Sequence, residues 1–268
     1  LDDGRVLLLG GWTPDGPSAS TELYDPAANQ LIPGPAMTTA RADPAVALLP
    51  DGRLLVAGGD DGDAPQAAAE LYDPAIGAFT ATGEMTTPRT SHAAIALPDG
   101  RVLVAGGMDA TGHVVASAEV YDPETGAFAP TGSMAQARYK FGAVALDDGA
   151  VLIIAGTDER DAAGALTTTE RYNPATGTFS TGPALRYARF KIGGSVAALP
   201  DGGGVLVAGG AAHAEVLTSD GSEVISPALG APYAFLTATT LIDGRVLLTG
   251  GYDDEIAVSR RTWHYTPS

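Results

Sequence analysis

The chain has 268 residues, of which 45% are hydrophobic, so it can bury a folded core and is not expected to be disordered. Its formal net charge of −17 disfavours binding to the phosphate backbone of nucleic acids. The absence of cysteine excludes disulfides, thiolate metal ligands and cysteine nucleophiles. The apolar runs are short and interrupted by Asp-Gly, so no membrane span is expected.

One phrase returns six times along the chain and predicts a repeated β-structure. It reads LDDGRVLLLGG from Leu1, LPDGRLLVAGG from Leu49, LPDGRVLVAGG from Leu97, LDDGAVLIIAG from Leu146, LPDGGGVLVAGG from Leu199 and LIDGRVLLTGG from Leu241. Asp-Gly between two apolar runs is a strong hairpin signal, because glycine accepts the positive φ of a tight turn. The apolar run after it is too short for a helix and rich in β-branched residues. We therefore expect the second strand of each unit at Arg5–Leu9, Arg53–Ala57, Arg101–Ala105, Ala150–Ala155, Val205–Ala208 and Arg245–Thr249.

A second phrase follows each apolar run and predicts the third and fourth strands of a unit. It reads ELYDP at Glu22 and Glu70, EVYDP at Glu119, ERYNP at Glu170, AEVLTS around Glu215 and WHYTP at Trp263. Proline cannot donate to a β-ladder, so this phrase ends a strand. A glycine turn then leads to an outer strand that carries an aromatic residue. Six units of roughly 50 residues, with four strands each, predict radially stacked blades.

These features resemble Kelch repeats: the diglycine that ends the second strand, the tyrosine beyond it and the aromatic residue of the fourth strand. The resemblance covers the whole chain and implies an all-β fold, a six-bladed β-propeller in a single domain over residues 1–268. Phe79, Phe128 and Phe179 stand where Kelch repeats usually have tryptophan. The chain starts at the second strand of blade one and ends after the third strand of blade six. We therefore expect another segment to supply the two strands that would close the ring.

Residues present in nearly every repeat are expected to serve the blade. Arginines recur just before the first strand, at Arg41, Arg89, Arg138 and Arg189, and glutamates recur in the third strand. The arginines could form an anion site. We favour the alternative, in which each arginine is held by the carboxylates or carbonyls of the third strand as a structural ion pair.

Residues that break the repeat indicate the ligand-binding site. The loops before the first strand and between the second and third strands share one face in Kelch propellers. Lys140 and Lys191 are the only lysines and occupy equivalent positions in blades four and five. Lysine stems often pack between blades, however, and Asp158, Glu159 and Asp161 are placed to neutralise these two. The residues that we expect to bind a ligand are Trp12, Tyr139, Lys140, Arg160, Arg186, Tyr187, Lys191, Tyr233 and Tyr252.

No catalytic residue, metal or cofactor is expected. The four histidines fall in different blades without ligand spacing, and we interpret each as a surface or packing residue. The loop from Asp60 to Asp63 offers oxygen ligands, but it lacks EF-hand spacing, and solvated loop charges are the favoured interpretation. Galactose oxidase is the best-known enzyme with a Kelch fold. Its copper-radical site needs a cysteine linked to a tyrosine, which this chain cannot make.

The function that we expect is non-enzymatic recognition of a protein or carbohydrate ligand on one propeller face. The alternative is a small-molecule enzyme with its site at the channel mouth near blades four to six. A deep pocket with converging carboxylates or histidines would indicate the enzyme. The near absence of lysine is typical of a high-GC bacterium, and similar bacterial Kelch proteins are often exported. This resemblance implies an extracellular or periplasmic location.

Overall fold

The computed structural model describes residues 1, 3–159, 164–226 and 228–267. Within these ranges the chain forms β-strands and one 3-10 turn, Pro200–Gly202, and has no α-helix. No helix in the described ranges is long and apolar enough to cross a membrane. The chain divides into two compact units, Leu1–Thr131 and Gly132–Ser268.

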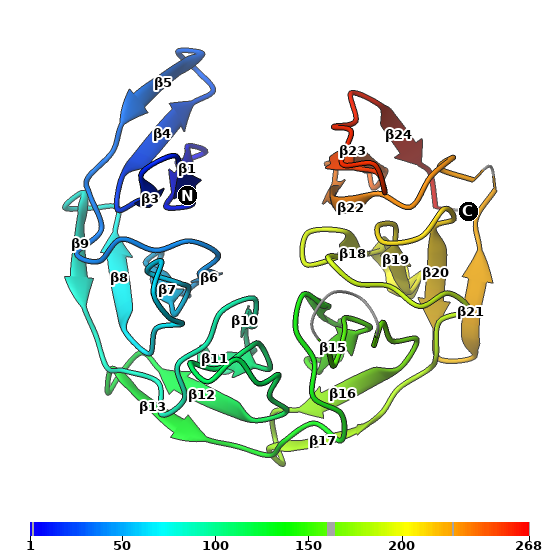
Figure 1. The fold of residues 1–268 in the computed structure, drawn as a ribbon, viewed down its shortest axis with the longest axis horizontal. Helices are drawn as coiled ribbons and strands as arrows, with labels where there is room; N and C mark the ends of the chain where they lie inside the picture. Colours follow the sequence, from blue (N-terminus) through cyan, green and yellow to red (C-terminus); the bar gives the residue numbers. More distant parts are fainter. Residues whose placement is uncertain (2, 160–163, 227, 268) are drawn as a thin grey trace. The chain divides into compact units, whose positions relative to one another are not determined.

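The first unit contains three blades, each an antiparallel sheet whose strands follow one another in chain order (Figure 1). Blade one consists of β1 (Val6–Leu9), β4 (Thr21–Asp25) and β5 (Gln30–Pro33), and a small hairpin of β2 (Trp12–Thr13) and β3 (Gly16–Pro17) lies between β1 and β4. Blade two consists of β6 (Ala45–Leu48), β7 (Leu54–Ala57), β8 (Ala69–Asp73) and β9 (Ala78–Ala81). Blade three consists of β10 (Ala93–Ala96), β11 (Val102–Ala105), β12 (Ala118–Asp122) and β13 (Ala127–Pro130).

The second unit repeats this pattern in three further blades (Figure 1). Blade four consists of β14 (Gly142–Ala145), β15 (Val151–Ile154), β16 (Thr169–Asn173) and β17 (Thr178–Thr181). Blade five consists of β18 (Val196–Ala198), β19 (Val205–Val207), β20 (Glu215–Thr218) and β21 (Gly221–Val224). Blade six consists of β22 (Ala234–Thr240), β23 (Val246–Tyr252) and β24 (Thr262–Tyr265).

The observed strands confirm the predicted fold class, an all-β, six-bladed β-propeller. The predicted second strands are β1, β7, β11, β15, β19 and β23, and most agree with the prediction to within one residue at each end. Strand β23 runs on to Tyr252, which pairs with Ala234. The diglycine of blade six therefore lies inside the ladder, whereas in blades two and three it follows the end of the strand.

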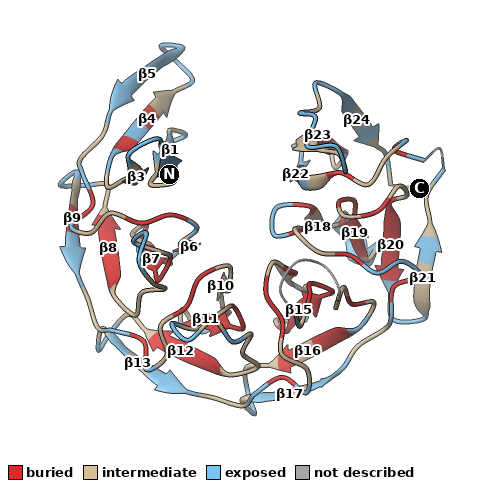
Figure 2. Cartoon of the chain, viewed as in Figure 1, coloured by how far each residue is buried: buried red, intermediate tan, exposed pale blue. Residues whose placement is uncertain are grey.

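Aromatic pairs join the third and fourth strands of blades two to four. The ring centroids lie 4.9 Å apart in Tyr72–Phe79, 4.8 Å apart in Tyr121–Phe128 and 4.8 Å apart in Tyr172–Phe179. The second and third strands are buried and the fourth strand is largely exposed (Figure 2). Phenylalanine therefore supplies the packing for which Kelch repeats usually carry tryptophan.

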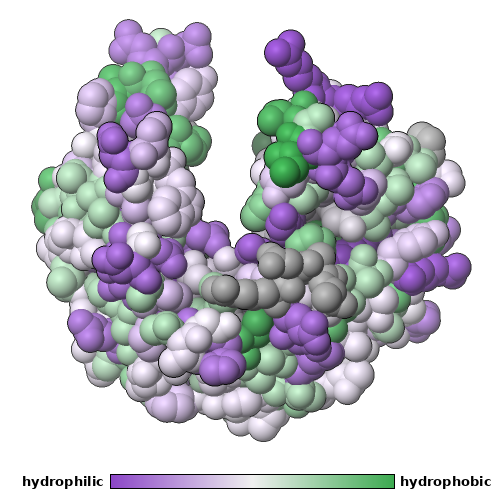
Figure 3. Space-filling view, in the orientation of Figure 1, coloured by the Kyte–Doolittle hydropathy of each residue, from purple (hydrophilic) through white to green (hydrophobic). Residues whose placement is uncertain are grey.

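Hydrophilic residues are spread over the face shown in Figure 3, on the blades of both units.

A buried ion pair links the loop before each of blades two to five to the third strand of the same blade. The nitrogen–oxygen distances are 2.8 Å in Arg41–Glu70, 3.2 Å in Arg89–Glu119, 2.9 Å in Arg138–Glu170 and 2.8 Å in Arg189–Glu215. In blade four, Arg138 Nη1 also donates to the carbonyls of Ala155 and Thr168. Glu170 accepts the backbone N–H groups of Ala135 and Gln136. The structural ion-pair interpretation is confirmed.

Blade six replaces this ion pair with an aromatic pair. The Tyr233 carbonyl accepts the N–H of Gly210, as the Arg189 carbonyl accepts the N–H of Gly156 in the preceding repeat. Trp263 lies opposite Leu248 in the ladder, as Glu170 lies opposite Ile153. Tyr233 and Trp263 thus occupy the arginine and glutamate positions, with ring centroids 5.3 Å apart. Two uncharged rings fill the space that two charges fill elsewhere.

The ion pairs predict an asymmetry between two glutamates at equivalent positions. Glu119 is buried against Arg89, whereas Glu22, at the same register in blade one, is exposed. We expect Glu119→Gln to lower the free energy of unfolding by about 3 kcal/mol, because a buried guanidinium loses its counter-charge. Glu22→Gln should change it by less than about 0.5 kcal/mol. Urea unfolding of both variants tests this, and equal shifts would contradict it.

Candidate functional site

The loop before the first strand places one side chain per blade in a left-handed backbone conformation. This residue stands two positions after the buried arginine, or after Tyr233 in blade six. Its φ is 51° at Asp43, 53° at Ser91, 52° at Lys140, 56° at Lys191 and 53° at Phe235. Positive φ is uncommon outside glycine, and residues held in this way concentrate at functional sites. The repeat fixes this conformation while the side chain differs between blades.

These left-handed residues contact one another between neighbouring blades of each unit. In the first unit, Ser91 Oγ donates a hydrogen bond to the Asp43 carboxylate. In the second unit, the backbone N–H of Phe235 donates to the Lys191 carbonyl at 2.8 Å. The N–H of Ile192 donates to the Lys140 carbonyl at 3.3 Å. The loops of blades four to six are therefore joined directly at these positions.

Lys191 lies among three aromatic rings, and we call Phe190, Lys191, Phe235 and Tyr252 the Lys191 cluster. The ammonium nitrogen is 5.2 Å from the ring centroid of Phe190, 5.8 Å from that of Phe235 and 5.2 Å from that of Tyr252. It also donates to the Tyr252 hydroxyl at 2.9 Å. Cation–π attraction at such distances stabilises the ammonium group without a counter-ion.

A cavity of about 280 Å³ opens beside the Lys191 cluster. Lys191 and Tyr252 line it together with Asp253 and Asp254. The Asp253 carboxylate accepts the backbone N–H groups of Glu255 and Ala257, which holds the turn in place. The Phe235 ring is 47% exposed. Phe235 lies beside this lining, and the aromatic residues within it are Phe190 and Tyr252. A cation, carboxylates, a hydroxyl and aromatic rings thus line one cavity.

Lys191 and Tyr252 are predicted site residues from neighbouring blades, and the structure joins them by a hydrogen bond. Lys140 lies over the ring of Tyr139, with its ammonium nitrogen 5.0 Å from the centroid, and Tyr139 is only 4% exposed. Tyr233 belongs to the core of blade six. Among the described residues neither lysine forms an ion pair.

Other predicted residues contact different partners. Arg186 Nε donates to the Ser222 carbonyl at 3.0 Å, and the Tyr187 ring stacks on His213 with centroids 5.6 Å apart. Trp12, in β2 of the first unit, is 64% exposed. Arg160 lies outside the described residues, as does Asp161.

Phe190 and Phe235 belong to the cluster but were absent from the predicted set of site residues. Aligning the repeats at the buried arginine would have placed Phe190 one position, and Lys191 two positions, beyond it. The same alignment places Phe235 at the position of Lys191 in the next blade. The signal was present in the sequence, but it depends on recognising that Tyr233 replaces an arginine.

No three His, Asp or Glu side chains within the described ranges gather as a metal site, and the chain has no cysteine. The residues therefore do not fit the copper-radical site of the Kelch-fold oxidase. In the loop from Asp60 to Asp63, Asp60 accepts the N–H of Gly62, and Asp61 accepts those of Asp63 and Ala64.

Comparisons with known proteins agree with the repeat and the fold. Residues 89–135 match the Kelch motif. A solved structure described as a novel fungal alcohol oxidase with catalytic diversity among the AA5 family, in complex with copper, is similar with a TM-score of 0.75 and 17% sequence identity. The likeness covers 99% of this chain and 61% of the oxidase chain, so this chain spans less than two thirds of the oxidase. No curated protein matches the chain.

His92 occupies a packing position with both ring nitrogens buried. It stands three residues after Arg89, where the next two blades have Phe141 and Ile192. The ring lies so close to Gly58 that a Cβ there would be 2.7 Å from His92 Cε1. Burial, with a smaller effect from the positive charge of Arg89, lowers the pKa of His92 to about 3.

This environment predicts a pH-dependent stability. Because the pKa of His92 is lower in the folded state, the unfolded chain binds the proton first as pH falls below about 6.5, and stability is lost from there towards pH 3. Replacing the ring as in His92→Phe should remove about 2 kcal/mol of the loss between pH 7 and pH 5. Urea unfolding at the two pH values measures it. Parallel losses in both proteins would contradict the prediction.

Proposed function

We propose that this chain, a Kelch-type β-propeller, is a non-enzymatic recognition module for a protein or carbohydrate ligand. The ligand would bind the face formed by the loops before the first strand and between the second and third strands. The Kelch propeller fold is commonly a binding module, and the family generally binds proteins. The fold alone does not assign a ligand, so the proposal rests on the site.

The Lys191 cluster is the observation that supports this proposal. Phe235 is exposed and its ring contacts Tyr252 and Lys191 at the edge of the cavity, where it offers an apolar face. Within the cavity, the Tyr252 hydroxyl, the Lys191 ammonium and the Asp254 carboxylate offer hydrogen bonds. Sugars present apolar C–H faces together with hydroxyl groups, so they match this combination. A volume of about 280 Å³ is at the lower end for ligand sites, which suits one sugar residue of a larger glycan. We therefore favour a carbohydrate ligand.

We also propose that the protein is bacterial and acts in an extracellular or periplasmic location. This rests on the residue usage, which is rich in glycine and alanine and nearly free of lysine. No nucleic-acid partner is proposed, because the net charge of −17 opposes the approach of a phosphate backbone. Residues 1–268 are proposed to act as one domain.

A small-molecule enzyme with its site near blades four to six is the second candidate. It is favoured by the likeness to a structure described as an alcohol oxidase. At 17% identity this likeness concerns the fold. Turnover of an alcohol by the purified chain, measured as aldehyde formation with and without added copper, would favour the enzyme over the recognition module.

Variants taken from the chain's own repeats test the binding proposal. Lys191→Ser introduces the residue that blade three has at this position, so the positive φ should be tolerated. We expect it to weaken glycan binding about tenfold, through the loss of a charged donor and its ring contacts. Phe235→Ser should act similarly by removing the exposed ring.

The matched control is Lys140→Ser, which removes the other lysine at the equivalent position of blade four. It should leave binding within about twofold of the unaltered chain, because Lys140 contacts Tyr139 and not the cavity. A glycan array identifies the ligand, and calorimetry at low salt measures affinity, since salt screens exposed charges. Equal loss in the Lys191 and Lys140 variants would remove the Lys191 cluster as the site.

A further inference from the structure

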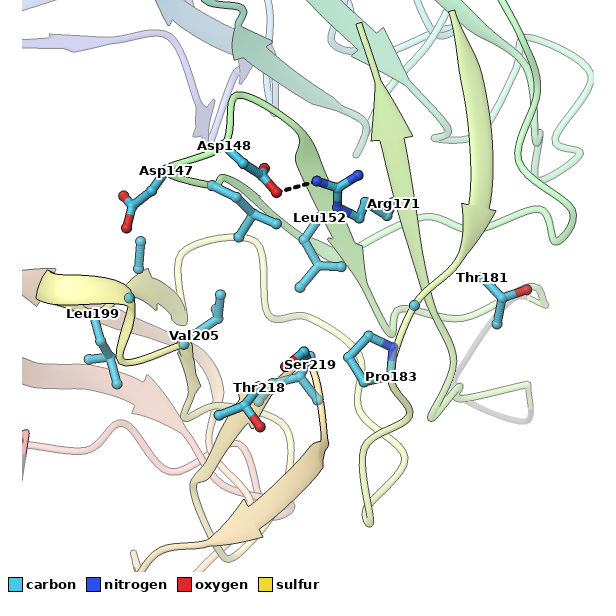
Figure 4. Close-up of a pocket in the computed structure, with 16 residues that line it drawn as sticks. Asp147, Asp148, Leu152, Arg171, Thr181, Pro183, Leu199, Val205, Thr218 and Ser219 are labelled. Carbon is cyan, nitrogen blue, oxygen red and sulfur yellow. Dashed lines mark hydrogen bonds and ion pairs between the residues drawn. The ribbon is translucent and has the colours of Figure 1, made fainter. Parts of the chain in front are cut away.

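A second and larger cavity, of about 730 Å³, lies between blades four and five (Figure 4). Leu152 and Arg171 of blade four line it on one side, and Val205 and Leu217 of blade five line it on the other. It is bordered by the turns that join the first strand to the second and the third to the fourth. These turns lie at the opposite ends of the strands from the Lys191 cluster, so this site is independent of the proposed function.

The same place between blades two and three is filled by a tyrosine. Tyr121 pairs with Val102 in the ladder, as Leu217 pairs with Val205. The Tyr121 side chain is fully buried, and its ring lies 4.8 Å from that of Phe128. Its hydroxyl shares a 2.8 Å hydrogen bond with Thr82 of the preceding blade. This tyrosine closes the gap between the two blades.

Blade five lacks the tyrosine and the phenylalanine of that arrangement, and blade four lacks the threonine. Leu217 replaces the tyrosine, and Ser222, which lies opposite it, replaces the phenylalanine. Gly182 stands where blade two has Thr82. The two positions are equivalent because the N–H of Gly182 donates to the Thr169 carbonyl, as the N–H of Thr82 donates to the Ala69 carbonyl. The cavity therefore includes the space that a tyrosine ring would fill, with Leu217 and Gly182 in its lining.

The lining of this cavity also contains a cation, Arg171, at a position that is apolar in other blades. Arg171 lies opposite Leu152 in the ladder, the register at which blade two has Leu71 opposite Leu55. Leu71 is 7% exposed, so the position is normally apolar and buried. A guanidinium at this position lines the cavity, beside the carboxylates of Asp147 and Asp148 (Figure 4). It is the cation in this lining with which a bound anion could pair.

The partner of Arg171 is also peculiar to blade four. In the Asp-Gly-Arg turns of blades one, two, three and six the aspartate binds the arginine two residues later, as Asp51 binds Arg53 at 2.7 Å. Ala150 replaces that arginine in blade four, and Asp148 instead accepts a hydrogen bond from Arg171 Nη2 (Figure 4). The guanidinium carries five N–H donors, so a second carboxylate can bind it beside Asp148.

We propose that this cavity binds a small aromatic carboxylate. Its ring takes the space of the missing tyrosine against Leu152, Val205 and Leu217, and its carboxylate binds the Arg171 guanidinium. The volume of about 730 Å³ lies within the range of small-molecule sites. A few polar groups on a mostly apolar lining are typical of such sites.

The direct test is calorimetric titration with 3-(4-hydroxyphenyl)propanoate, compared with 4-propylphenol, which has the ring but no carboxylate. We expect the carboxylate to bind at least about tenfold more tightly. Leu217→Tyr restores the side chain of the repeat and should abolish binding of both compounds. Arg171→Val restores an apolar residue, as at Val120, and should weaken binding of the carboxylate about tenfold without changing that of 4-propylphenol.

Arg101→Ala is the matched control, because it removes a partly exposed arginine, paired with Asp99, from a blade that does not line the cavity. It should leave both affinities unchanged. Melting temperatures establish that each variant is folded, and the two cavity variants report independently. No binding by the unaltered chain, binding retained by Leu217→Tyr, or equal affinity for the two compounds would each overturn the proposal.

Discussion

The buried ion pair between an arginine and a glutamate organises the blades of this chain. Removing two charges from water is costly, and their attraction offsets that cost only when the geometry is good and further hydrogen bonds satisfy the two groups. Here the guanidinium binds the carboxylate and two carbonyls through its Nη atoms, whereas its Nε is buried without a partner. The carboxylate also binds two backbone N–H groups of the loop before the first strand. The pair therefore specifies the path of that loop more than it adds net stability.

The aromatic pair of blade six shows that this role does not require charge. Tyr233 and Trp263 occupy the same two positions as Arg189 and Glu215 in blade five and keep the same backbone hydrogen bond. Packed apolar groups of similar volume often replace a buried ion pair without loss of stability. The last repeat, although divergent in sequence, thus keeps the path of the loop before its first strand through aromatic packing in place of an ion pair.

The fold and the ion pairs could be predicted from the sequence, because six phased copies give each residue an equivalent. The contacts of side chains at equivalent positions could not. Lys140 and Lys191 share a backbone conformation, yet only Lys191 meets aromatic rings of the next blade, because that blade carries Phe235 and Tyr252. The repeat defines a position, whereas the neighbouring repeat defines its surroundings.

Missing side chains are harder to recognise than unusual ones. The two lysines are conspicuous in the sequence, but the degraded phrase around Glu215 reads as a weakened repeat. The packing shows that Leu217 leaves part of a cavity open beside Arg171. Arg171 itself follows a recurring glutamate, at a position that is apolar in blades one, two, three and five. The environment of its guanidinium becomes clear only from the residues of the facing blade.

The five left-handed positions separate folding from recognition. Each lies two positions after an anchored residue, and aspartate, serine, lysine and phenylalanine all adopt this left-handed conformation within a single chain. Substitution there changes surface chemistry while the anchor, and with it the blade, stays intact. A combinatorial library restricted to these five codons would therefore sample binding specificity at nearly constant stability, with each blade diversified separately.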